Sequence, residues 1–131
     1  MSLRIGIDLV EVELVAQALT GPHGHHYLSR IFTEREVRDS SRRGSIDPQC
    51  LAARFAAKEA TLKALLLGDE GLSPHTIEVR VSPSGRAHLE LIGRAAEMAM
   101  AAGAIDLALS LAHSGRFAAA LVVVECLPPT A

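Results

Sequence analysis

Apolar and polar residues alternate along the first segment of the chain. The apolar positions are Leu3, Ile5, Ile7 and Leu9, and the residues between them are Arg4, Gly6 and Asp8. A period of two is typical of a half-buried β-strand, which places Asp8 on its polar side. From Glu11 to about Leu19 the apolar period becomes that of a helix. We therefore expect a strand followed by a helix at the start of the chain.

The centre of the chain predicts a long helix that carries charged residues on its apolar face. Asp47 is a good N-cap before Pro48, and Gly68 is a suitable stop. At helical spacing, one face collects Leu51, Phe55, Leu62 and Leu66. Glu59 falls inside this face, and Lys63 lies at its edge. Because a carboxylate on a buried face is costly unless a charge meets it, we interpret this helix as the wall of a site.

The remaining pattern predicts shorter elements. These are a loop over 20–26, one or two helices over 27–39, a loop over 40–45, strands over about 76–82 and 87–92, a helix over 93–103, and strands over 105–112 and 117–125. Thr33 followed by Glu36 fits a capping box. Helices between hairpin-linked strands predict an α+β fold, with a largely antiparallel sheet packed against a long central helix. We expect one domain over 1–126 and a tail over 127–131.

Composition narrows the class of protein. Hydrophobic residues make up 49% of the 131 residues and charged residues 21%, which is typical of a globular domain. Aromatic residues are only 3%, so stacking platforms for nucleic-acid bases are not expected. A net charge of -2 does not indicate a polyanionic partner. No apolar run reaches membrane-spanning length, and Cys50 and Cys126 lack metal-type spacing. We expect a cytoplasmic protein without nucleic-acid or membrane partners.

Two acids far apart in the sequence are candidate metal ligands. Asp8 and Glu59 could supply oxygen ligands to Mg²⁺, which usually takes one or two protein carboxylates and completes its shell with water and phosphate. On its own, Asp8 could equally face solvent or cap the next helix. Lys63, four residues after Glu59, could form an ordinary ion pair with it or neutralise phosphate charge in a transition state. Arg54 and Lys58 could add contacts to an anion.

Three other groups of polar residues carry weaker signals. Ser110 and His113 stand near the end of a predicted strand, where a histidine is most often a turn residue. The pair Arg42-Arg43 lies in a predicted loop and is more typical of solvated surface. The group His23, His25 and His26 could suggest a metal site, but its glycine-rich setting favours a loop.

Taken together, four segments resemble the holo-acyl-carrier-protein synthase type of 4′-phosphopantetheinyl transferase. In chain order they are Gly-Ile-Asp-Leu-Val-Glu at 6–11, Ile-Phe-Thr-Glu-Arg-Glu at 31–36, Arg-Phe-Ala-Ala-Lys-Glu-Ala at 54–60 followed by Lys-Ala at 63–64, and Ser-Leu-Ala-His at 110–113. Gly85-Arg86 also stands where the family has a Gly-[Lys/Arg]-Pro turn. The helix motif combined with the distant Asp8 is the specific part of the resemblance.

The resemblance implies an activity and its residues. Such enzymes transfer the phosphopantetheine arm of coenzyme A to a serine of an apo acyl carrier protein and release 3′,5′-ADP, in fatty acid or polyketide biosynthesis. Asp8 and Glu59 would hold Mg²⁺ on the pyrophosphate, Glu59 would help to deprotonate the serine, and Lys63 would stabilise the leaving phosphate. Arg54 and His113 would contact the 3′-phosphoadenosine end, with Ser110 also predicted to bind coenzyme A. The family implies a homotrimer with each site at a subunit interface.

Three positions depart from the family pattern. Leu14 stands where a basic residue often docks the acidic carrier protein, Ala112 replaces the second serine of the Ser-x-Ser-His hairpin, and Ala87 replaces the proline of the turn. They predict altered carrier specificity or reduced activity. An alternative function is a carrier-protein or coenzyme A binding module of the same fold with weak or lost transferase activity. A further alternative is an unrelated small α+β enzyme that uses Mg²⁺ and a nucleotide.

Overall fold

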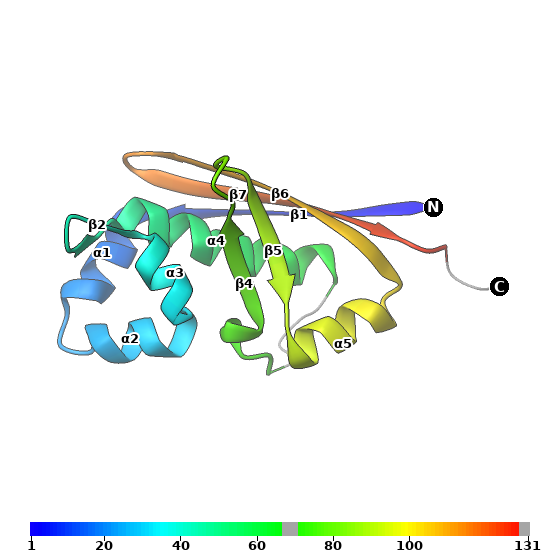
Figure 1. Cartoon of the computed structure of the whole chain (residues 1–131), viewed down its shortest axis with the longest axis horizontal. Coiled ribbons are helices and arrows are strands. Elements are labelled where there is room, and N and C mark those ends of the chain that lie inside the picture. Colours follow the sequence, from blue (N-terminus) through cyan, green and yellow to red (C-terminus); the bar gives the residue numbers. More distant parts are fainter. Residues whose placement is uncertain (67–70, 129–131) are drawn as a thin grey trace.

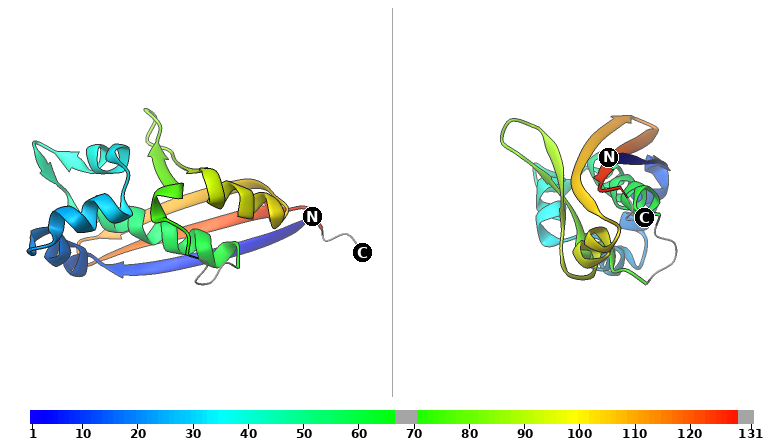
Figure 2. Two further views of the ribbon diagram at one scale, coloured as in Figure 1. Left: turned by 90° about the horizontal axis from the view of Figure 1, so that it is seen from below. Right: turned by 90° about the vertical axis from the view of Figure 1, so that its right-hand side faces the viewer.

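A three-stranded antiparallel sheet packed on one long helix organises the protein (Figure 1). The computed structural model describes residues 1–66 and 71–128. The strand order is β1 (Ser2–Glu11), β7 (Phe117–Cys126) and β6 (Ala104–Ser114), and β7 pairs antiparallel with both neighbours. The long helix α4 (Pro48–Ala64) packs against β1 and β7 on one face of this sheet (Figure 2). The predicted α+β class is confirmed.

The other elements surround α4. In chain order they are α1 (Val12–Thr20), α2 (Gly24–Ile31), α3 (Glu34–Asp39), β2 (Ser41–Arg42), β3 (Ser45–Ile46), the 3₁₀ turn η1 (Pro74–Thr76), β4 (Ile77–Val81), β5 (Ala87–Leu91) and α5 (Gly93–Ala101). The helices α1 to α3 gather at one end of the molecule, whereas α5 lies near the other end (Figure 1). The antiparallel hairpin β4–β5 lies between them.

Several predicted boundaries need correction. The predicted loop over 20–26 is too long because α2 already begins at Gly24, and the predicted loop over 40–45 contains the small hairpin β2–β3. The helix α4 ends at Ala64, and the predicted stop at Gly68 lies outside the described residues, as do residues 129–131 of the predicted tail. None of the helices in the described part of the chain is long and apolar enough to cross a membrane.

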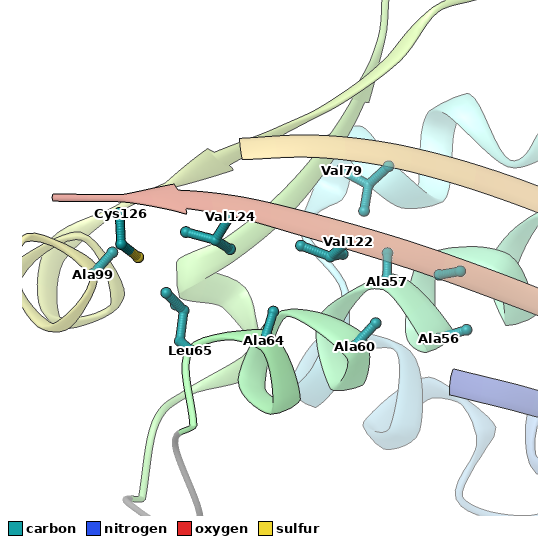
Figure 3. Packing of buried hydrophobic residues seen from close by; sticks show 11 residues of the cluster. Ala56, Ala57, Ala60, Ala64, Leu65, Val79, Ala99, Val122, Val124 and Cys126 are labelled. Atoms are coloured by element: carbon teal, nitrogen blue, oxygen red, sulfur yellow. The ribbon is translucent and has the colours of Figure 1, made fainter. Parts of the chain in front are cut away.

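The buried face of α4 is built from alanine and not from the predicted leucine face. Leu51 is buried as expected, but Phe55 and Leu62 are only half-buried and Leu66 is exposed. The alanines that pack under the sheet are Ala56, Ala57, Ala60 and Ala64, and the strand residues above them are Val122 and Val124 (Figure 3). Small side chains let the helix approach the sheet closely, so the larger residues are displaced to the edge of the contact.

The first strand has its apolar side chains on the outside. Leu3, Ile5, Ile7 and Leu9 are between 63% and 72% exposed. The alternate positions face α4, so the polar side of the strand, which carries Asp8, is its inner side. The row of exposed apolar residues continues onto β7, where Leu121 is directly opposite Ile7 and is also exposed. The outer face of this sheet is therefore apolar and bare in the single chain.

A buried ion pair ties α3, α4 and β4 together. Lys58 Nζ lies 2.8 Å from Glu36 Oε1, and the two side chains are 3% and 0% exposed. Lys58 also donates to the carbonyl oxygens of Ile77 (2.6 Å) and Pro74 (2.9 Å), while Glu36 Oε2 accepts from the Val79 N–H (2.9 Å). Burial lowers the pKa of the Lys58 ammonium, and the charge of Glu36 acts against that shift.

The same carboxylate completes the predicted capping box. Glu36 Oε1 accepts from the Thr33 N–H at 2.9 Å, and Thr33 Oγ1 accepts from the Glu36 N–H at 3.1 Å. The box is confirmed, and its second member also neutralises Lys58. A charge buried this deeply is tolerated because each of its polar atoms has a partner.

We predict that Lys58→Met destabilises the protein by about 3–5 kcal/mol, because it leaves the Glu36 carboxylate buried without a counter-ion. Adding Glu36→Gln removes that unpaired charge, so the double variant should be more stable than Lys58→Met alone. Lys63→Met, at an exposed position of the same helix, is the control, with an expected change below about 1 kcal/mol. Urea unfolding followed by circular dichroism measures all three. Equal midpoints for Lys58→Met and the unmodified protein would contradict the prediction.

Candidate active site

Gly6 allows β1 to touch the backbone of α4. A Cβ atom at this position would overlap the carbonyl oxygen of Ala60 and lie 2.7 Å from the amide nitrogen of Ala64. Only a residue without a side chain fits this contact. The main chains of β1 and α4 are therefore in direct contact at Gly6, two residues before Asp8.

The contacts of β1 show which residues of α4 lie beside each strand position. Arg4 donates to the carbonyl oxygen of Leu65 at 3.4 Å, and Gly6 lies against Ala60 and Ala64. The strand and the helix thus run in opposite directions. Two strand residues advance about 6.6 Å, which equals about four helical residues. Asp8 therefore stands at the level of Glu59, one turn closer to the helix start than Lys63.

Lys63 reaches across from α4 to β1. Its Nζ atom lies 3.0 Å from Asp8 Oδ1 and donates to the carbonyl oxygen of Ile7 at 3.0 Å. The Asp8 side chain is 17% exposed and that of Lys63 is 56% exposed, so the pair sits at the surface with its acid sheltered. Lys63 thus pairs with the distant acid and not with Glu59 on its own helix.

Glu59 lies on the same side of α4 as Lys63, one turn away. Its side chain is half-buried, and its carboxylate makes no hydrogen bond or ion pair with any residue that the structure describes. Glu59 therefore lies on the side of α4 that carries Lys63, and Lys63 in turn meets Asp8 on β1. Two carboxylates and an ammonium group at one place can bind a metal–phosphate complex, in which the metal offsets the acids and the ammonium meets the phosphate.

The donor set fits a hard divalent cation. Within residues 1–66 and 71–128, no group of three or more His, Cys, Asp or Glu side chains is gathered for a metal, and this also applies to the histidines at 23, 25 and 26. Asp8 and Glu59 are the residues that could hold Mg²⁺, because this ion is usually bound by one or two carboxylates together with water and substrate phosphates. The free carboxylate of Glu59 is consistent with that role.

A second group of predicted residues lines a pocket at the other end of α4. Arg54 and His113 face a cavity of about 480 Å³, which Arg42 and Gly85 also line. Arg54 is 6% exposed and donates from Nη1 to the carbonyl oxygen of Cys50 at 3.1 Å, but its buried Nε has no hydrogen-bond partner among the described residues. A buried guanidinium with an unused N–H is well suited to an anion.

The fold separates these two groups within one chain. Asp8 belongs to β1 and His113 to β6, the opposite edges of the sheet, and α4 packs over the face between them. Ser110 lies in neither group. It is exposed on the outer face of the sheet, where its partner on β7 is Leu121. The structure therefore pairs Lys63 with Asp8, leaves Glu59 one helical turn from Lys63, brings Arg54 and His113 to one pocket, and places Ser110 apart from these groups.

Sequence reasoning did not show that Arg42 lines the pocket of Arg54. Arg42 is exposed, as expected for solvated surface, and the small hairpin β2–β3 places it at this pocket, with Nη2 lying 4.0 Å from the sulfur of Cys50. The available signal was the density of arginine in the segment 30–43. Spacing alone could not show that this segment folds back against the first turns of α4.

Comparison with known proteins identifies the family. The model of the 4′-phosphopantetheinyl transferase superfamily matches residues 4–122. The chain is 38% identical over 126 residues to a holo-[acyl-carrier-protein] synthase of Koribacter versatilis and 42% identical over 127 residues to one of Salinispora arenicola. Each match covers 95% of this chain and 99% of the relative. The chain therefore belongs to the 4′-phosphopantetheinyl transferase superfamily.

A solved structure agrees with this assignment. The Chronobacterium ammoniagenes ACPS-CoA complex superposes with a TM-score of 0.85 at 30% identity, covering 98% of this chain and 100% of that one. The predicted family, fold and enzyme class, a 4′-phosphopantetheinyl transferase, are confirmed. The alternative of an unrelated Mg²⁺- and nucleotide-dependent enzyme is thereby wrong.

We predict that Gly6→Ala destabilises the protein by about 1–3 kcal/mol, because the added methyl group forces β1 away from the α4 backbone. Gly21→Ala is a matched control. Gly21 has an ordinary φ of -75°, and an added Cβ would lie 3.1 Å from the Gln17 carbonyl oxygen, so a much smaller loss is expected. Guanidinium unfolding measures both variants. A Gly6→Ala midpoint no lower than that of Gly21→Ala would refute the packing argument.

Proposed function

We propose that the chain transfers the 4′-phosphopantetheine arm of coenzyme A to a serine of an apo acyl carrier protein, with Mg²⁺, and releases 3′,5′-ADP. The relatives are holo-[acyl-carrier-protein] synthases, and the similar Chronobacterium structure is a complex with coenzyme A. The observation that carries the proposal is the contact of Lys63 with Asp8 beside the free carboxylate of Glu59. This group has the charges that a diphosphate and its cation need.

The reaction is a phosphoryl transfer in which the protein mainly positions the groups and balances charge. The carrier serine Oγ attacks the β-phosphorus of coenzyme A, and the bond from that phosphorus to the bridging oxygen of 3′,5′-ADP breaks. Glu59 accepts the serine proton, directly or through an ordered water. Lys63 meets the negative charge that develops on the leaving phosphate. Mg²⁺ held by Asp8 and Glu59 would polarise the diphosphate oxygens.

The pocket of Arg54 suits the other end of coenzyme A. A 3′-phosphate carries a charge that the buried guanidinium of Arg54 can pair with, together with Arg42 and His113 at the rim. The unused Nε of Arg54 supports this role because a bound phosphate would give it an acceptor. Arg54 and His113 are therefore proposed to bind the nucleotide and not to take part in bond breaking.

We also propose that the active form is a homotrimer with each site at a subunit interface. Two observations support it. The residues proposed to hold the diphosphate, at Asp8, and the pocket proposed for the nucleotide, at His113, lie at opposite edges of the sheet in one chain. A neighbouring copy can therefore complete a site that one copy leaves divided. The outer face of the sheet, with Leu3, Ile5 and Ile7 exposed, is also a contiguous apolar surface of the kind that mediates association.

We predict that Asp8→Asn, Glu59→Gln and Lys63→Met each lower the rate of carrier modification by about 100-fold or more. Each substitution removes a charged side chain that is proposed to hold the diphosphate of coenzyme A and its Mg²⁺. The assay incubates the protein with coenzyme A, Mg²⁺ and an apo carrier protein and follows the gain of one phosphopantetheine arm by intact mass spectrometry. Glu97→Gln, an exposed change on α5, should leave the rate unaltered.

Two results of this assay would count against the proposal. A full rate for Glu59→Gln would show that the metal and proton-transfer roles of this carboxylate are wrong. No mass gain with any of several apo carriers would reject transferase activity and favour a binding module of the same fold.

We predict that Ile5→Glu converts the trimer to a monomer and abolishes transfer, because it places a charge in the centre of the proposed apolar interface. Light scattering coupled to size-exclusion chromatography gives the mass of each form. Met100→Glu changes an even more exposed apolar residue on α5 and should remain trimeric. A wild-type protein that elutes as an active monomer would disprove the interface.

A further inference from the structure

Lys63 is held against β1 by two acceptors that both belong to the strand. Its Nζ atom lies 3.0 Å from Asp8 Oδ1 and donates to the carbonyl oxygen of Ile7, also at 3.0 Å. A lysine at the surface loses side-chain entropy when it is fixed in one conformation. Here the ammonium group is nevertheless fixed on the carboxylate that is proposed to hold the metal.

The two proposed metal ligands differ in whether the chain itself already uses them. One carboxylate oxygen of Asp8 accepts from Lys63, whereas the carboxylate of Glu59 makes no hydrogen bond or ion pair with any residue that the structure describes. A divalent cation at Asp8 would meet the ammonium group at the same carboxylate, and the two positive charges would repel each other. Lys63 therefore opposes the binding of a cation to Asp8.

The pair of Lys63 and Asp8 is weak enough to open. The Lys63 side chain is 56% exposed, and ion pairs in contact with water contribute little to stability. Lys58, the other lysine of the sequence, is only 3% exposed, and its ammonium group has a carboxylate and two carbonyl oxygens around it. Lys58 is therefore fixed, whereas Lys63 can exchange its acceptors on β1 for the charged oxygens of a phosphate.

We propose that Lys63 couples the binding of the divalent cation to the binding of coenzyme A. This inference rests on the proposed transferase function. In the chain alone, Lys63 neutralises Asp8 and lowers its affinity for a cation. The diphosphate oxygens of bound coenzyme A draw the ammonium group away from Asp8, so the carboxylate becomes available to Mg²⁺. By linkage, the cation and coenzyme A each strengthen the binding of the other.

This coupling gives Lys63 a role that is separate from its role at the leaving phosphate. Asp8 is the sheltered member of the pair, and a sheltered carboxylate without a partner is costly. The ammonium group removes that cost in the chain alone, and the cation takes its place when coenzyme A is bound. The group that holds the diphosphate is therefore assembled fully only when both ligands are bound.

The first test measures cation binding in the absence of any carrier protein. The probe is Mn²⁺, which takes oxygen ligands as Mg²⁺ does and whose free form is quantified by electron paramagnetic resonance. Without coenzyme A, Lys63→Met should bind Mn²⁺ about threefold or more tightly than the unmodified protein, because the competing ammonium group is gone. Saturating coenzyme A should then raise the Mn²⁺ affinity of Lys63→Met by a factor at least about threefold smaller than that of the unmodified protein.

Two controls separate the effect at Asp8 from a change in net charge. Arg94→Met removes one positive charge at an exposed position on α5 and should leave the Mn²⁺ affinity unchanged. In an Asp8→Asn background, Lys63→Met should no longer tighten Mn²⁺ binding, because the carboxylate through which the lysine acts is absent. Equal tightening in Arg94→Met, or undiminished tightening in the double variant, would show a general charge effect and overturn the proposal.

The second test follows the lysine itself. Lys58 and Lys63 are the two lysines of the sequence, so protein that contains isotopically labelled lysine gives two side-chain signals in nuclear magnetic resonance spectra. Lys63→Met identifies which signal is which. Titration with coenzyme A and Mg²⁺ should shift the Lys63 signal and leave that of the buried Lys58 in place. A Lys63 signal that stays unmoved at saturating coenzyme A would overturn the proposal.

Failure of this inference can be told apart from failure of the transferase function. Neither test needs a carrier protein, so the coupling is measurable even in a protein that modifies no carrier. A protein that modifies carriers but binds Mn²⁺ equally well with and without Lys63 keeps the proposed function and loses the coupling. If neither form binds Mn²⁺, with or without coenzyme A, the metal site and the coupling are rejected together.

Discussion

The contact of Gly6 with the backbone of α4 is the constraint on which the pairing of Asp8 with Lys63 depends. Because no side chain intervenes, β1 lies so close to the helix that Asp8 meets Lys63 without either chain bending. The same closeness explains why α4 buries alanine and why the large side chains of β1 point outward. One glycine thus sets the placement of the acid, the packing of the core and the apolar outer face.

The buried ion pair of Lys58 and Glu36 also holds α4 in place. It fixes the start of α3 through the capping box and holds β4 through Val79, so the β4–β5 hairpin is tied to α4. Lys58 immediately precedes Glu59 in the sequence. A single turn of helix therefore has one charged residue buried in the core and the next half-buried. The segment 54–60 thus places Lys58, which supports the fold, next to Glu59, the proposed metal ligand.

Local sequence signals predicted the elements well but not the faces they bury. Thr33 and Glu36 formed the expected capping box, and Asp47 accepts from the Gln49 N–H as an N-cap should. The alternation of β1 showed a strand but could not show which of its two faces meets the helix, because an apolar face can pack on another subunit as well as on the core. The prediction that α4 buries its leucine face is wrong for a related reason, because close packing against the sheet favours alanine.

The candidate site was predictable only where the resemblance to a family added long-range information. The spacing of Glu59 and Lys63 suggests an ion pair within one helix, yet Lys63 pairs with Asp8, 55 residues away in the chain. No periodicity links these two positions. The pocket of Arg54 was equally hidden, because its lining residues come from α3, β2, α4, β4 and β6 and meet only in the folded chain.

The pairing of β1 with β7 has a consequence for how the chain folds during synthesis. Ser2 pairs with Cys126, so β1 is synthesised long before the strand that pairs with it. Until that partner emerges, β1 is an unpaired apolar strand, which is the state most prone to pair with other chains. Contacts so distant in sequence also close slowly. A nascent chain stalled before β7 should therefore depend on chaperones far more than its short length suggests.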